Sequence, residues 1–197
     1  MPGRFDPLAP SGSSALLTDH YELTMLQASL ADGTARRRCV FEVFARSLPP
    51  GRRYGVVAGT GRVLDALEAF HFTGDQLDWL ADADVVDDAT LAYLADYRFT
   101  GSVTGYGEGD CYFPQSPVLT VEAPFGEAVV LETLLLSILN HDSAVASAAS
   151  RMTVAATGRP CVEMGSRRTH EAAAVASARA AYVAGFTSTS NLEAGHR

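Results

Sequence analysis

The sequence predicts an α/β protein in two parts, a mixed α+β domain over 16–157 and the start of a parallel α/β layer over 158–197. Two observations carry this. Helical and strand-like periodicities alternate irregularly up to a long apolar helix that ends near Thr157. After it, strand, helix, strand and helix follow one another with short loops, which is typical of parallel α/β folds. Residues 1–15, rich in Pro, Gly, Ser and Ala, predict a flexible tail.

The composition indicates a folded domain and excludes several function classes. Of the 197 residues, 47% are hydrophobic and 19% charged, as in globular proteins. The net charge of −8 argues against general nucleic-acid binding. All cations are Arg, which excludes Schiff-base lysines and the lysine-bearing P-loop from this stretch. We expect no membrane span, no disulfide framework and a cytoplasmic location, since long apolar runs, a signal core and C-x-x-C pairs are absent.

The elements of the first part follow from periodicity and capping signals. A helix starts at Thr18 or Asp19 and ends at Gly33, whose lack of a side chain suits a left-handed cap. The remaining elements are a strand within 36–48, a strand or helix lead-in at 54–57, helices at 60–70, after Thr73 and from 87 or 88 to 97, about three antiparallel strands in 99–124 and a helix over 126–157.

In the second part, Cys161–Met164 predicts a buried strand and 170–185 an Ala-rich helix. A polar turn at 187–191, after a very short strand, precedes a helix starting at Leu192. The polar segments 165–170 and 187–191 then follow successive parallel strands. In α/β barrels that edge holds the active site.

Three other patterns receive ordinary structural interpretations. The acidic run between Asp82 and Asp88 suits helix N-termini better than a metal site. The glycines of Gly105–Gly109 have G-x-G-x-G spacing without a following helix, so they indicate hairpins and not a nucleotide fingerprint. We expect His141 to be a structural or interface histidine and not a catalyst.

The segment from Glu163 to His170 has the chemistry of an anion site. Arg167 and Arg168 are adjacent, and each guanidinium offers a planar fork of donors that matches phosphate oxygens. The alternative is a surface ion pair between Arg167 and Glu163 or Glu171. For His170 we expect a helix cap.

Five blocks, in this order, resemble the nicotinate phosphoribosyltransferase family. They cover the chain from about Leu16 to Arg197 and comprise Leu17–Met25, Tyr112–Pro114, Leu131–Thr133, Glu163–Arg168 and Gly185–Gly195. The resemblance implies a mixed N-terminal domain followed by an irregular α/β barrel of the nicotinate/quinolinate phosphoribosyltransferase type. It implies the joining of nicotinate to phosphoribosyl pyrophosphate, driven by ATP through a phosphohistidine, with Mg²⁺ on the phosphates, in a homodimer that shares its active sites.

The resemblance also implies roles for individual residues. Tyr21 matches a tyrosine that stacks on the pyridine ring of the neighbouring subunit's substrate, although a tyrosine packed in the core would give the same pattern. Arg167 matches the arginine that binds the phosphoribosyl group, with Arg168 as the weaker candidate because adjacent strand side chains point oppositely. Glu163 and Ser166 match positions close by. Asp19 is placed near the phosphates or Mg²⁺, or caps the helix.

Residues Thr189, Ser190 and Asn191 bear on the choice of base. In the related nicotinamide-specific family an aspartate falls at about position 190, where it accepts from the carboxamide. A carboxylate there repels nicotinate, whereas the Ser190 hydroxyl can donate to it. We therefore expect the acid to be favoured over the amide.

The family's phosphohistidine lies in a Gly-Thr-x-x-His block expected beyond Arg197, and His196 lacks that context. We therefore assign no catalytic residue and no metal ligand set here, and we expect the 197-residue chain alone to be an inactive N-terminal portion. Two alternatives stay open. One is a nicotinamide- or quinolinate-type phosphoribosyltransferase. The other is a non-catalytic phosphate-binding or assembly module.

Overall fold

The computed structural model describes residues 13–197, so most of the predicted tail lies outside it. Its first half contains η1 (Ala15–Leu17), α1 (His20–Ala31), β1 (Arg38–Phe44), β2 (Gly55–Val56), α2 (Thr60–Glu68), α3 (Gly74–Asp82) and α4 (Asp88–Ala95). There follow β3 (Ser102–Gly105), β4 (Cys111–Tyr112), β5 (Pro117–Pro124), α5 (Phe125–Val129), α6 (Glu132–Ala156), β6 (Val162–Glu163), η2 (Ser166–Arg168), α7 (Glu171–Val183), β7 (Ser188–Thr189) and α8 (Leu192–His196).

The last residues of the predicted tail are packed into the domain. Ser13 is 5% exposed and Ala15 is fully buried. The Ser13 hydroxyl donates to the carbonyl of His71, which lies just before α3. The folded region therefore starts earlier than the predicted boundary at residue 16.

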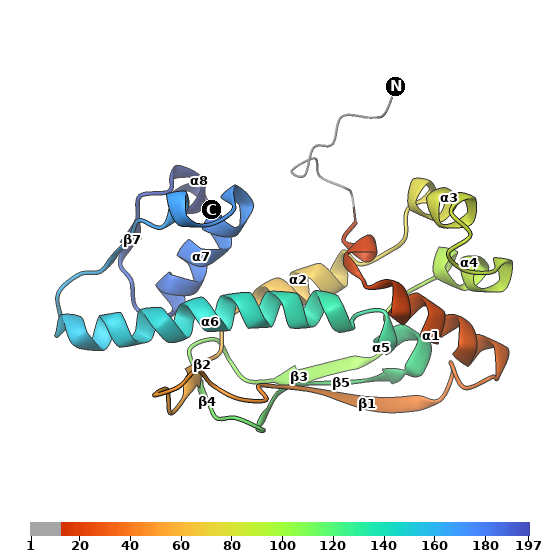
Figure 1. The fold of residues 1–197 in the computed structure, drawn as a ribbon, viewed down its shortest axis with the longest axis horizontal. Coiled ribbons are helices and arrows are strands. Elements are labelled where there is room, and N and C mark those ends of the chain that lie inside the picture. The colour runs from red at the N-terminus through yellow and green to blue at the C-terminus, as the bar shows by residue number, and fades with distance from the viewer. Residues whose placement is uncertain (1–12) are drawn as a thin grey trace.

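The main sheet has the strand order β1-β5-β3 and is antiparallel throughout. The strand predicted within 36–48 is β1, in which Cys39 lies opposite Ala123 and Phe41 opposite Val121, so Cys39 and Phe41 share one face of the sheet. Ala123 and Val121 are buried on this face. The sheet lies along one side of α6, the 25-residue helix that crosses the molecule (Figure 1).

The helix predicted over 126–157 is divided in the structure. Val129, Val130 and Leu131 are buried in succession, at 2%, 0% and 0% exposure, where α5 ends and α6 begins. A straight surface helix buries a single stripe of side chains, so three successive buried residues require a change of direction. None of the described helices is long and apolar enough to span a membrane.

The strands predicted within 99–124 form, but β4 pairs with β2 and not with β3. The prediction that the glycines of Gly105–Gly109 lie in a hairpin is therefore wrong. Gly105 ends β3, and Gly107 and Gly109 lie in the loop that passes from one sheet to the other. Gly109 has φ +94°, a conformation that suits glycine. Its N–H donates to the Val57 carbonyl at 2.9 Å, which fixes the loop beside β2.

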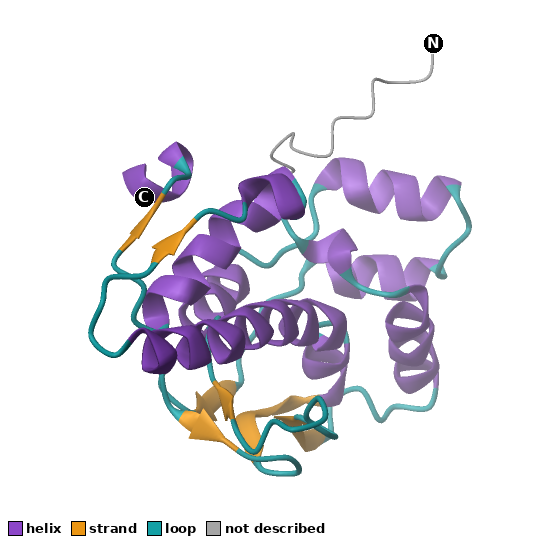
Figure 2. Cartoon of the chain, turned by 60° about the vertical axis from the view of Figure 1, so that its left-hand side comes forward, coloured by secondary structure: helices purple, strands orange, loops and turns teal. Residues whose placement is uncertain are grey.

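The predicted parallel layer is present at the far end of α6. The helix ends with Thr157 and Gly158 at positive φ, 50° and 84°. β6 and β7 then pair in parallel, with Val162 opposite Ser188 and Glu163 opposite Thr189 (Figure 2). The two predicted polar segments consequently leave the same edge of this sheet.

Candidate functional site

The two polar segments beyond β6 and β7 are held together by direct hydrogen bonds. The Ser190 N–H donates to the Glu163 carbonyl at 2.9 Å. The Asn191 side-chain amide donates to the Ser166 hydroxyl at 3.1 Å. The structure therefore brings together the predicted site residues of both segments at one edge, here called the polar rim (Ser166–Arg168 and Thr189–Asn191).

The side chains of Glu163 and Asn191 hold the backbone of the rim in place through hydrogen bonds. One Glu163 carboxylate oxygen accepts from the Thr189 hydroxyl at 2.8 Å, and the other accepts from the Gly165 N–H. The Asn191 side-chain oxygen accepts from the Ala194 N–H at 3.0 Å and caps α8. These polar groups have protein partners, so a ligand would meet a prearranged frame.

Arg167 and Arg168 lie in the short 3₁₀ turn η2 and are exposed. Neither forms an ion pair with any residue in 13–197, so the alternative of a pair with Glu163 or Glu171 is wrong. Arg168 is also predicted to be the weaker candidate because adjacent strand side chains point oppositely, and that reason does not hold. These residues are not on a strand, and in a 3₁₀ turn neighbours diverge by about 120°. Both guanidinium groups are available to an anion.

His170 and Ser190 take different places around the rim. His170 is the N-cap of α7, and its Nδ1 accepts from the Ala172 N–H at 3.3 Å, as predicted. Ser190 is exposed, and only its backbone forms a hydrogen bond within the described residues. Its hydroxyl is therefore open to a ligand at the rim.

Tyr21 on α1 and Asp19 just before it lie far from the rim, because α1 and the rim elements β7 and α8 are in opposite halves of the molecule (Figure 1). α1 packs at the start of α6, whereas the rim follows β6 and β7, beyond the end of α6 in the sequence. Tyr21 is 45% exposed, so the core interpretation is wrong. Partial burial raises its pKa, as does the nearby Glu132 carboxylate. Asp19 occupies the N-cap position of α1, but its side chain makes no capping hydrogen bond.

The sequence interpretation missed Glu22, which is fully buried beside Tyr21. Its carboxylate accepts hydrogen bonds from the Thr133 N–H at 2.9 Å and from the hydroxyls of Thr133 and Thr18. A signal was present, since Glu22 lies four residues before the buried Leu26 and thus on the buried stripe of the helix.

Ion pairs join the rim's supporting helix α7 to the first part of the chain. Arg179 on α7 donates to Glu108 at 2.7 and 2.8 Å. On α6, the fully buried Asp142 accepts from Arg62 at 2.8 and 2.9 Å and lies 2.8 Å from His141 Nδ1. The structural role expected for His141 stays a prediction, and this contact gives its ring a partner within α6.

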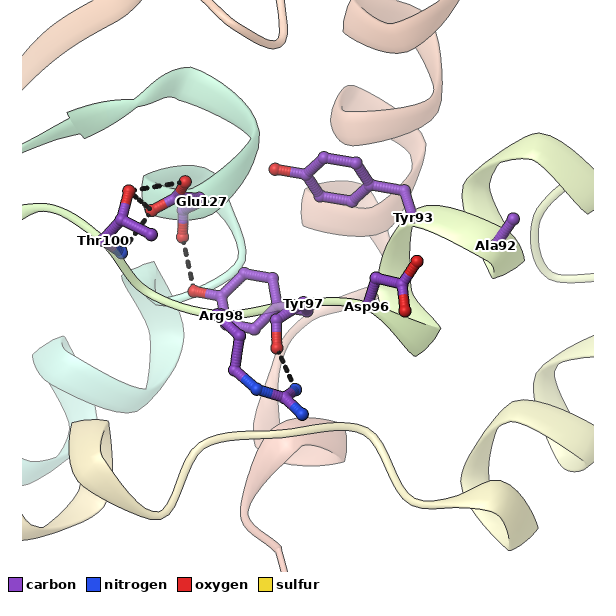
Figure 3. Close-up of a pocket in the computed structure, with 7 residues that line it drawn as sticks. All are labelled: Ala92, Tyr93, Asp96, Tyr97, Arg98, Thr100 and Glu127. Carbon is purple, nitrogen blue, oxygen red and sulfur yellow. Dashed lines mark hydrogen bonds between the residues drawn. The ribbon is translucent and has the colours of Figure 1, made fainter.

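A separate hollow of about 300 Å³ lies between α4 and α5, and none of the predicted site residues lines it (Figure 3). Several of its polar groups are already bonded to one another. The Tyr97 hydroxyl donates to the Glu127 carbonyl at 2.7 Å, and Glu127 accepts from Thr100. Burial strongly raises the pKa of Tyr97, so its hydroxyl stays protonated. The cationic residue among those that line this hollow is Arg98, and its guanidinium donates to the Tyr97 carbonyl (Figure 3).

The fold and the rim together define an α/β protein whose polar site lies at the carboxyl edge of parallel strands. Residues 16–140 match the family model described as the nicotinate phosphoribosyltransferase (NAPRTase) N-terminal domain. The chain therefore belongs to the nicotinate phosphoribosyltransferase family, as the resemblance indicated.

Individual relatives agree with this membership. The chain is 61% identical over 195 residues to nicotinate phosphoribosyltransferase pncB1 of Mycobacterium tuberculosis, covering 99% of this chain and 42% of that protein. It is 38% identical over 186 residues to nicotinate phosphoribosyltransferase of Bacillus subtilis, covering 94% and 38%. The crystal structure of human nicotinic acid phosphoribosyltransferase superposes with a TM-score of 0.83 and 31% identity, covering 91% and 37%. The chain thus spans about two fifths of these relatives' length.

Proposed function

We propose that this chain is the N-terminal part of a nicotinate phosphoribosyltransferase, a ligase-type enzyme of NAD biosynthesis that couples ATP hydrolysis to the joining of nicotinate and phosphoribosyl pyrophosphate. The observation that carries the proposal is the rim, where Arg167 and Arg168 form no ion pair within residues 13–197 and share η2 with Ser166. The Ser166 hydroxyl accepts from Asn191, which follows Ser190 on the other segment of the rim. Guanidinium forks suit the phosphate oxygens of the phosphoribosyl substrate.

The reaction is a displacement at an anomeric carbon that gains positive charge. Such a transition state depends on alignment and charge placement more than on a strong acid or base. In this proposal Arg167 holds the phosphate, and Glu163, Thr189 and Asn191 keep the rim in shape through their hydrogen bonds.

Tyr21 supplies the stacking face for the pyridine ring, and it does so in a homodimer. Within one chain α1, which carries Tyr21, and the rim elements β7 and α8 lie in opposite halves of the molecule (Figure 1), so one copy cannot place both on one substrate. The half-exposed ring of Tyr21 is available to a second copy. Two copies that exchange these ends complete two sites.

Ser190 favours nicotinate over nicotinamide. Its exposed hydroxyl can donate to a carboxylate, and no acidic residue is present at positions 187–191. Quinolinate, with a second carboxylate, would draw on both arginines, so it is the competitor to include.

Mg²⁺ and ATP are expected to accompany the reaction. Mg²⁺ on substrate phosphates needs only one or two protein carboxylates, and Asp19 is an exposed carboxylate free of capping bonds. Bound Mg²⁺ would neutralise pyrophosphate charge, and Arg167 would bind the remaining phosphate oxygens. We place the enzyme in the cytoplasm.

The test is a turnover assay on the natural polypeptide, expressed from its complete reading frame. We expect nicotinate mononucleotide and pyrophosphate from nicotinate and phosphoribosyl pyrophosphate, stimulated by ATP, and we expect nicotinamide and quinolinate to compete poorly. The isolated 197-residue chain is the second arm, and it should show no turnover. Phosphate binding without turnover by the natural polypeptide would instead support the non-catalytic module.

A further inference from the structure

Glu22 is a fully buried carboxylate that ties α1 to the start of α6. It accepts from the Thr133 N–H at 2.9 Å, from the Thr133 hydroxyl and from the Thr18 hydroxyl. Thr133 lies 111 residues along the chain, so this contact is made by the tertiary fold. Burying a carboxylate is costly unless its hydrogen bonds are satisfied, and here they are.

The Glu22 carboxylate provides the N-terminus of α6 with a cap that this helix otherwise lacks. Its N-cap residue, Leu131, has no side chain that can accept a hydrogen bond, and no side-chain cap is present. The first N–H groups of a helix lack intrahelical partners and attract negative charge. Glu22 therefore caps α6 from a different helix, which fixes the rotation of α1 about its own axis.

Tyr21 adjoins Glu22, and its direction depends on that rotation. Successive residues of an α-helix point about 100° apart, so a helix that buries Glu22 presents Tyr21 at its surface. The ring is 45% exposed, and Glu132, the first residue of α6, lies close enough to raise the pKa of Tyr21. The N-terminus of α6, which Glu22 caps, therefore also lies beside the Tyr21 side chain.

We propose that Glu22 is a positioning residue for the pyridine base, acting through Tyr21. The carboxylate touches no substrate. Its hydrogen bonds to Thr133 hold the Tyr21 ring in the direction from which it stacks on nicotinate. This inference rests on the proposed function, because Tyr21 needs a ring to stack on.

The experiment measures kcat, the KM for each substrate and nicotinate binding by calorimetry on the natural full-length polypeptide. We expect Tyr21→Ala and Glu22→Ala each to raise the KM and Kd for nicotinate about tenfold, the loss of roughly one aromatic contact. The KM for phosphoribosyl pyrophosphate should change by less than about twofold, since in the proposed site its phosphate is bound by the Arg167 guanidinium and not by the Tyr21 ring.

Rescue and coupling separate positioning from general stability. Glu22→Gln keeps an oxygen for the Thr133 N–H, so its nicotinate KM should stay within about threefold of the wild type. The double variant Tyr21→Ala with Glu22→Ala should bind nicotinate no more than about twofold more weakly than Tyr21→Ala alone, because Glu22 acts through the ring.

Two further variants keep the test decisive if Glu22→Ala does not fold. Thr133→Val removes one donor to the carboxylate and should raise the nicotinate KM about threefold, again only when Tyr21 is present. Ser29→Ala is the matched control, since Ser29 is 5% exposed on the same helix and donates to the Leu26 carbonyl at 2.7 Å. It should leave both KM values unchanged.

The outcomes divide clearly. Two outcomes would overturn the positioning role and leave the proposed function standing. One is that Tyr21→Ala and Glu22→Ala act independently, with multiplicative effects. The other is that the nicotinate KM responds to Tyr21→Ala but not to Glu22→Ala or Thr133→Val. Nicotinate binding without turnover, with the expected coupling, would overturn the proposed reaction and keep the positioning role. Absence of nicotinate binding would overturn both.

Discussion

The Thr189 hydroxyl donates to the Glu163 carboxylate at 2.8 Å, and the same two residues face each other in the register of the parallel strands β6 and β7. A side-chain bond thus reinforces the backbone pairing at the rung from which the polar rim starts. Because the other carboxylate oxygen holds the Gly165 N–H, Glu163 also fixes the turn that carries Arg167. Glu163 is therefore a framework residue of the candidate site.

Arg167→Ala should weaken binding of phosphoribosyl pyrophosphate. A charge-assisted hydrogen bond contributes about 1.5–3 kcal/mol, so we expect the KM to rise roughly tenfold to a hundredfold. Steady-state kinetics with varied phosphoribosyl pyrophosphate measure it. Arg159→Ala, which removes an exposed arginine before β6, is the control and should have no effect. Equal losses in both variants would show a general charge effect.

Ser190→Asp should reduce the use of nicotinate. Two like charges about 4 Å apart repel by about 1–4 kcal/mol at or near a protein surface, so kcat/KM for nicotinate should fall about tenfold or more. Nicotinamide should become the better substrate in competition assays, since a carboxylate can accept from its amide. Ser137→Asp adds the same charge at an exposed position on α6 and should change neither substrate. An unchanged nicotinate preference in Ser190→Asp would contradict the role of Ser190.

The Glu108–Arg179 pair should make stability depend on pH. The hydrogen bonds from Arg179 lower the pKa of Glu108 below its usual 4.5. The pair therefore stabilises the fold fully above pH 4.5, and this contribution is lost as the pH falls through the lowered pKa. At pH 7, Glu108→Gln should lower the free energy of unfolding by about 1 kcal/mol, a value reduced for solvent screening because Arg179 is 40% exposed.

Urea unfolding of the wild type and Glu108→Gln at several pH values measures this difference. It should shrink below pH 4.5 and weaken in high salt. Glu122→Gln is the control, because the Arg38–Glu122 pair is exposed on both sides and 3.8 Å long. A pH-independent difference for Glu108→Gln would mean that the carboxylate contributes packing and not charge.

The Arg62–Asp142 pair should respond unequally to loss of either partner. Asp142 is fully buried, whereas the Arg62 side chain is 37% exposed. Arg62→Met leaves a buried charge without its cation and should cost about 3 kcal/mol. Asp142→Asn should cost less, because Arg62 can be hydrated. The double variant should recover more than half of the loss, as measured by urea unfolding at pH 7. Equal losses from the two single variants would contradict this account.

Several features were predictable because their signals are local. The helix start after Thr73 and the His170 cap each depend on contacts within one helical turn, and both form as predicted, the first through a capping box with Gln76. The parallel pairing of β6 and β7 followed from the order strand, helix, strand, which brings both carboxyl ends to one edge. The grouping of Ser166, Ser190 and Asn191 at the rim followed in turn.

Other features could not be read from neighbouring residues. Glu22 and Thr133 are 111 residues apart, Arg62 and Asp142 80, and Arg179 and Glu108 71. In the sequence each of these charges looks like an ordinary solvated side chain. The break between α5 and α6 was also missed, because an apolar run gives the same pattern whether a helix continues or turns.

The sequence by itself determined the type of most elements, their caps and the polar rim that follows the parallel strands, since these depend on contacts within a turn or between consecutive elements. Only the tertiary structure decided that Glu22 is buried and caps α6, that Arg167 and Arg168 form no ion pair within residues 13–197, and that α1 and the rim lie in opposite halves of the molecule. The physical reason is that the burial and pairing of a charge depend on which distant surfaces meet, and local periodicity carries no information about that.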